Sequence, residues 1–140
     1  MSHIQILPIL LPLFGSIAIL FANLLNHKTQ QILSITLVFL LILVNIVAFS
    51  NVMQSGMLVY QLGNWPAPFG ITLVLDQLSA MMILLTSVLA LGALWYAIAC
   101  EIDGDGIHFH VLFQLQLFGI NGAFLTGDVF NLFVFFEVLL

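Results

Sequence analysis

Charge is the scarcest property of this sequence. Only 5% of its 140 residues are charged, with one lysine or arginine and six acids, whereas about a quarter of the residues in an average soluble domain are charged. A basic patch interleaved with aromatic side chains is therefore missing, and nucleic acid is excluded as a partner. The formal net charge of −5 indicates no acidic partner surface, because the acids fall in predicted connections and helix ends, with Glu137 as the exception.

Cysteine is equally scarce. Cys100 is the only one, which excludes an internal disulfide framework. The chain has neither cysteine clusters nor paired membrane histidines for iron–sulfur or haem ligation, so we expect no cofactor. The first 25 residues lack a positively charged start and a small-residue cleavage site, and we interpret them as a spanning helix, not a signal peptide.

The spacings of common metal sites are missing as well. Asp103 and Asp105 stand beside glycines, but the twelve-residue spacing and the closing glutamate of a calcium loop are absent. His108 and His110 are two residues apart and would point in different directions on a helix, which argues against a shared zinc site. The sequence therefore predicts no metal site.

Apolar residues make up 63% of the chain, and the mean hydropathy is +1.26. This composition predicts an all-α integral membrane protein, a bundle of transmembrane helices that forms one membrane domain over residues 1–140. Four apolar runs are predicted to span the membrane, the fourth being shorter than the others, whereas a fifth of about thirteen residues falls short of the roughly twenty needed, which predicts an N-terminal fragment of a longer protein. The expected spans are 4–25, 32–53, 77–97 and 111–126, with the incomplete fifth helix at 128–140.

A stretch rich in glycine and proline separates the second span from the third. Two short β-prone runs flank the residues that break any helical period, so we predict a β-hairpin at about 57–75 on the outer face. Trp65 and Phe69 lie in its turn, where amphipathic rings are common at the membrane interface.

The connection between the first two spans, 26–31, is polar and holds Lys28, the only lysine or arginine. The positive-inside rule places this connection in the cytoplasm, and the connection 100–110 between the third and fourth spans is expected on the same side. Asn45 is the one strongly polar residue inside the second span, and we expect it to form a hydrogen bond with a neighbouring helix.

Two aspartates precede predicted helices. Asp76, with Ser79 three positions on, is interpreted as the N-cap of the third span, with a role in a proton relay as the alternative. Asp128 follows a glycine in a tight turn and is expected to cap the fifth helix.

The fourth span is shorter and more polar than the others, with Gln114 and Asn121 among its residues. Small residues at three- and four-residue spacing predict a face on which another helix backbone can approach closely. This face consists of Gly119, Gly122, Ala123 and Thr126.

Glu137 is the acid that requires a functional explanation. If a helix starts at Asp128, nine residues at about 1.5 Å each place Glu137 roughly 13 Å into a hydrocarbon core about 30 Å thick. A central acidic side chain costs on the order of 3 kcal/mol on insertion scales, so an acid there marks a functional position. We predict that Glu137 transfers protons, with Asp76, Asp128, Gln114 and Asn121 as supporting residues. The alternative is that Glu137 lies at a wet helix end.

Two segments carry a resemblance to a known family: Leu115–Leu140, LQLFGINGAFLTGDVFNLFVFFEVLL, and Gly63–Ile71, GNWPAPFGI. Together they resemble the D subunit of the Mrp-type multisubunit Na⁺/H⁺ antiporters. That subunit is related to the antiporter-like subunits of respiratory complex I and membrane-bound hydrogenases.

The resemblance implies a fold with two inverted repeats, of which this chain supplies the first helices and the opening of repeat one. In the family a glutamate of the fifth helix pairs with a lysine on a later broken helix, and Glu137 stands at that glutamate's position. The implied function is a subunit of a monovalent cation/proton antiporter, a transporter and not an enzyme, assembled with other subunits in the plasma membrane of a prokaryote as a multi-pass protein. The alternatives are a proton-pumping subunit of an NADH:quinone oxidoreductase or a membrane-bound hydrogenase, or a truncated fragment that does not transport.

Overall fold

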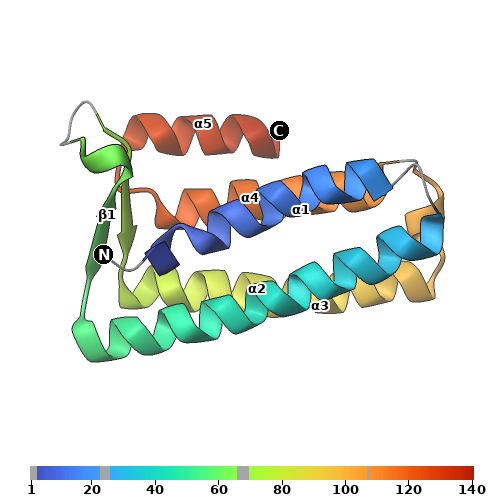
Figure 1. Ribbon diagram of the computed structural model, residues 1–140, viewed down its shortest axis with the longest axis horizontal. Helices are drawn as coiled ribbons and strands as arrows, with labels where there is room; N and C mark the ends of the chain where they lie inside the picture. Colours follow the sequence, from blue (N-terminus) through green and yellow to red (C-terminus); the bar gives the residue numbers. More distant parts are fainter. Residues whose placement is uncertain (1–2, 23–25, 66–69, 107) are drawn as a thin grey trace.

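The computed structural model describes residues 3–22, 26–65, 70–106 and 108–140. Figure 1 shows a bundle in which α1 and α4 lie together above the pair α2 and α3, while α5 lies on the outer side of α4. A small sheet crosses one end of the bundle, here called the hairpin end. The helices are α1 Leu7–Ala22, α2 His27–Ser55, α3 Gln77–Ala99, α4 Phe109–Leu125 and α5 Val129–Leu139; the strands are β1 Leu58–Gln61 and β2 Thr72–Leu75; the 3₁₀ turns are η1 His3–Gln5, η2 Leu62–Asn64 and η3 Ile102–Gly104.

The helices differ in how well their lengths fit a membrane. Among the described residues, α2 with 29 residues and α3 with 23 are long and apolar enough to cross one. The apolar helices α1 and α4 have 16 and 17 residues, fewer than the roughly 20 that a span needs. An α-helical bundle with two helices of spanning length is therefore confirmed, while four full spans stay a prediction.

The start of α2 corrects the predicted boundary. Asn26 is its N-cap, with extended φ and ψ of −152° and 148°, and the helix begins at His27, so most of the predicted connection 26–31 is the first part of α2. Hydropathy marks the edge of the apolar segment, whereas helical hydrogen bonding continues wherever polar side chains find partners. Here Gln30 is buried and Gln31 donates to a carboxylate.

The predicted β-hairpin is present as a two-stranded antiparallel sheet. Leu58 of β1 is paired with Leu75 of β2, and Gln61 with Thr72. The side chain of Trp65 in the intervening turn is 64% exposed, as a ring at a membrane interface would be, whereas Phe69 lies outside the described residues.

The turn between α4 and α5 is attached to the free edge of β2. Thr126 forms an isolated antiparallel bridge with Leu73, and the Gly127 amide donates to the Thr72 carbonyl over 2.8 Å. A side chain at Gly127 would meet Val74, so glycine permits this approach. The sheet therefore fixes the position at which α5 begins.

Polar side chains inside the bundle tie its helices together. The Asn45 amide donates to the Ile83 carbonyl of α3 over 2.9 Å, which confirms the expected bond from α2 to a neighbouring helix.

The apolar core around these residues forms two clusters. The one nearer the sheet contains Leu73, Leu75, Ile83 and Leu125, and the other contains Val38, Leu41, Leu94 and Leu117.

Candidate functional site

Helix α5, which carries Glu137, has a defined start. Asp128 is its N-cap, and its Oδ1 accepts a hydrogen bond from the Phe130 amide over 3.3 Å, which confirms the predicted cap. One turn further on, the Asn131 amide donates to Thr126 Oγ1 over 3.0 Å. The second of these bonds connects the first turn of α5 to Thr126, the residue that forms the bridge with strand β2.

One face of α5 packs closely on α4. Phe135 and Leu139 lie over Gly122 and Gly119, and a side chain at either glycine would collide with them. Phe118 meets the Phe135 ring edge to face, with centroids 5.4 Å apart. The two glycines of the small-residue face predicted on the fourth helix thus lie in the contact between α4 and α5, as expected.

Glu137 lies on the other side of α5. Its side chain is exposed, and so are the residues one and two turns before it on the same face, Phe130, Phe133 and Val134. This acid therefore stands within an apolar helical surface that the described residues leave uncovered. Lys28 is in the first turn of α2, and Figure 1 shows that the start of α2 and α5 are well separated along the bundle.

Asp76 forms a complete capping box at the start of α3. Its Oδ1 accepts from the Ser79 amide over 2.7 Å, and the Asp76 amide donates to Ser79 Oγ over 2.9 Å. The hydrogen bonds from the Ser79 backbone and side chain hold the pKa of Asp76 below its ordinary value. The predicted cap is confirmed, and these bonds favour it over a proton relay, because they stabilise the ionised carboxylate.

Gln114 and Asn121 are fully buried, whereas Glu137 is exposed. The Gln114 amide donates to the Ser34 carbonyl of α2 over 3.4 Å, and the Asn121 amide donates to the Pro8 carbonyl of α1 over 2.9 Å. Both side chains thus point toward the helices on the side of α4 away from α5. The structure does not bring these two predicted supporting residues together with the acid.

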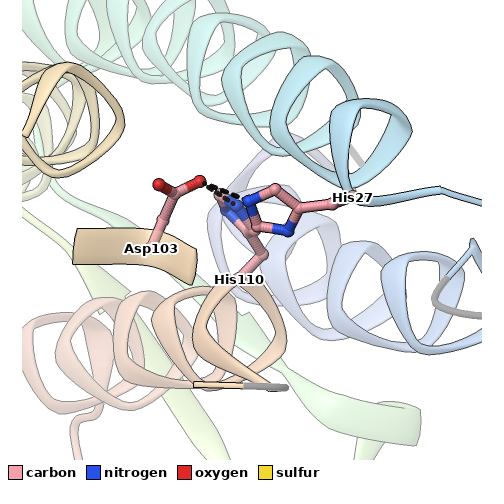
Figure 2. A group of neighbouring side chains, drawn as sticks. All are labelled: His27, Asp103 and His110. Carbon is pink, nitrogen blue, oxygen red and sulfur yellow. Dashed lines mark hydrogen bonds and ion pairs between the residues drawn. The ribbon is translucent and has the colours of Figure 1, made fainter. Parts of the chain in front are cut away.

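The densest group of titratable side chains lies at the end of the bundle opposite the sheet, and sequence reasoning missed it. Figure 2 shows His27 of α2 and His110 of α4 converging on Asp103 of η3. Each histidine Nε2 is 3.1 Å from Asp103 Oδ2, and the Gln31 amide nitrogen donates to the same oxygen over 2.6 Å. Asp103 and His110 are 1% exposed, whereas the His27 side chain is 48% exposed. We call these four residues the inner cluster.

Electrostatics keep the carboxyl group of this cluster ionised. Burial alone would raise the pKa of Asp103, but hydrogen bonds from Gln31 and His110 and the charge of His27 outweigh it and hold the pKa below the ordinary value. The sequence offered a partial signal, since both connections that carry these residues were expected on the same side of the membrane. The contact between His27 and Asp103 depends on α2 beginning at His27. Hydropathy alone predicted that this helix begins several residues later in the sequence.

No protein-family model matches the chain, but individual proteins match it along its whole length. The D subunit of a probable K⁺/H⁺ antiporter of Rhizobium meliloti is 51% identical, and the D subunit of the Na⁺/H⁺ antiporter of Alkalihalophilus pseudofirmus is 44% identical; each alignment covers 100% of this chain. Along its whole length this chain is therefore similar to antiporter D subunits. It spans 27% and 28% of those two relatives, or about a quarter of their length.

Solved structures of two membrane complexes also contain chains that are similar to this one. A chain of the archaeal membrane-bound sulfane sulfur reductase, a respiratory complex, matches 99% of this chain with a TM-score of 0.91 and 28% identity. A chain of the Mrp complex from Dietzia sp. matches 99% of it with a TM-score of 0.72 and 30% identity. The matched part is 28% and 26% of those chains.

Proposed function

We propose that this chain is part of a multisubunit monovalent cation/proton antiporter in the plasma membrane of a prokaryote, and that Glu137 is its proton-carrying group. The observation that carries the proposal is the position of Glu137 on an apolar face of α5, opposite the face packed on α4. The homology to antiporter D subunits at 44% and 51% identity supports the class of transporter.

The apolar surroundings explain how Glu137 would work. An acid on an apolar face of a membrane helix commonly belongs to a proton pathway, in which it is paired with another charged group. We propose a lysine as the partner of Glu137. Such a partner has to come from outside this chain, whose single lysine lies at the start of α2.

A second candidate is a redox-powered, proton-pumping subunit, favoured by the TM-score of 0.91 to a respiratory complex. The two candidates differ in their energy source. With the full-length protein assembled in its complex, everted vesicles should show pH changes when Na⁺ or K⁺ is added in the absence of any electron donor. A pH response that required an electron donor and ignored both cations would replace the antiporter proposal with the redox one.

Orientation gives a further prediction. We propose that α1 to α4 all cross the membrane, with the sheet outside and the inner cluster in the cytoplasm, because Lys28 begins α2 at that end. Cys100 is exposed, is the only cysteine and follows α3 at the same end. An impermeant maleimide should therefore leave Cys100 of this protein unmodified in intact cells and modify it fully in everted vesicles. If Cys100 were modified as fully in intact cells as in everted vesicles, the proposed topology would be wrong.

A further inference from the structure

We propose that the inner cluster binds one divalent transition-metal ion of the Zn²⁺ type, with His27, Asp103 and His110 as its ligands. The three side chains come from α2, η3 and α4, and one ligand atom of each lies within 4.8 Å of the others. Two imidazoles and a carboxylate are the donor set of zinc sites that keep a fourth position for water. This proposal concerns residues remote from Glu137 and stands independently of the proposed function.

Two of the three distances between the ligand atoms suit a small tetrahedral ion, whereas the two histidine nitrogens are up to 4.8 Å apart and would have to move closer together. Two ligands at 2.0–2.1 Å from zinc are about 3.3 Å apart at a tetrahedral angle. Each histidine Nε2 is 3.1 Å from Asp103 Oδ2, so an ion would need shifts of only a few tenths of an ångström in these two pairs. Figure 2 shows that both imidazoles already direct Nε2 at the carboxylate.

Hydrogen bonding alone leaves this arrangement overcrowded. Three nitrogens, from Gln31, His27 and His110, converge on one oxygen that offers two lone pairs. The Gln31 amide nitrogen is also 3.3 Å from His27 Nε2, so His27 cannot both accept that bond and donate to Asp103 through the same atom. An ion between the imidazoles and the carboxylate would resolve the conflict, because both histidines would then present lone pairs.

The donor set also selects the kind of cation. Imidazole nitrogen is a good ligand for Zn²⁺, Co²⁺ and Ni²⁺, whereas hard cations prefer sites made of oxygen atoms alone. The proposed ion is therefore distinct from a transported Na⁺ or K⁺. The half-exposed His27 provides the route of entry to two ligands that are 1% exposed. A bound ion would join the ends of α2, η3 and α4.

The test uses the full-length protein in its complex, purified in detergent and stripped with EDTA. Competition with a chromophoric chelator measures Zn²⁺ affinity, and the visible spectrum of added Co²⁺ reports tetrahedral coordination. We expect one high-affinity ion per copy of this protein that is lost in His27→Ala, Asp103→Asn and His110→Ala. Gln31 orients the carboxylate from outside the ligand set, so Gln31→Ala should weaken binding by about 10–100-fold. His108→Ala, an exposed histidine two residues from a ligand, is the matched control and should bind as the parent does.

Because other subunits of the complex can also hold metal, the decisive quantity is the difference between the parent and the variants. Equal Zn²⁺ stoichiometry and equal Co²⁺ spectra in the parent, His27→Ala and His110→Ala would overturn the proposal. If His110→Ala does not assemble, His27→Ala decides alone, since its side chain is half exposed and its loss leaves no buried cavity. Cation/proton exchange measured on the same samples tests the proposed function separately.

Discussion

Replacing Glu137 with glutamine in the full-length, assembled protein is expected to lower cation-dependent proton exchange by about tenfold or more, since proton transfer by a positioned acid is commonly worth about 100-fold. Glutamine has nearly the same shape but cannot ionise. The side chain contributes no packing to the contact between α4 and α5, which Phe135 and Leu139 provide. The variant should therefore assemble normally. Everted vesicles with a fluorescent pH probe measure the exchange.

Two further variants make the result specific to this carboxyl group. Glu137→Asp keeps an ionisable group one methylene shorter and should retain part of the exchange. Glu101→Gln removes an acid from an exposed position at the start of η3, where the side chain makes no capping hydrogen bond. This variant should leave cation-dependent proton exchange almost unchanged. Parental exchange by Glu137→Gln with normal assembly would show that the working site lies elsewhere.

Enlarging Gly122 is expected to disrupt the structure that supports Glu137. A Cβ at this position would overlap the Phe135 ring, so Gly122→Leu must push α5 away from α4. Overpacking of this kind typically costs about 1–3 kcal/mol. The loss should appear as a lower thermal unfolding temperature of the detergent-solubilised complex, together with reduced exchange, because Glu137 moves with its helix.

The chain offers a matched control for this substitution. Gly92 of α3 has no described atom within 4 Å of the place where a Cβ would lie, so Gly92→Leu should leave the unfolding temperature almost unchanged. Adding Phe135→Ala to Gly122→Leu returns space to the contact and should recover part of the lost stability. Equal unfolding temperatures for the two leucine variants would mean that the close contact between α4 and α5 is not formed.

Features set by short-range sequence patterns were predictable. The caps at Asp76 and Asp128 depend on side chains bonding amides two or three residues on, and the glycine spacing of α4 marks one face directly. The hairpin followed from β-prone runs bounded by glycine and proline, and its two strands pair as expected.

Features set by tertiary packing were not predictable in the same way. Hydropathy could not show that α2 begins at His27, because the polar residues at its start are stabilised by Asp103, 72 residues away from Gln31 in the chain. The inner cluster was missed for the same reason, since His110 was compared only with its sequence neighbour His108. For Glu137 the sequence identified the acid and its apolar face, and the described residues leave that face uncovered.

The attachment of the α4–α5 turn to strand β2 also bears on aggregation and on the order of synthesis. An open strand edge is a template for pairing with other molecules, and in β2 one edge is paired with β1 while the other bonds Thr126 and Gly127. During translation β2 emerges about fifty residues before the turn that seals it. Until the α4–α5 turn has been synthesised, the nascent hairpin therefore exposes an unsealed edge, and a chaperone or a partner protein that binds there would act only in that interval.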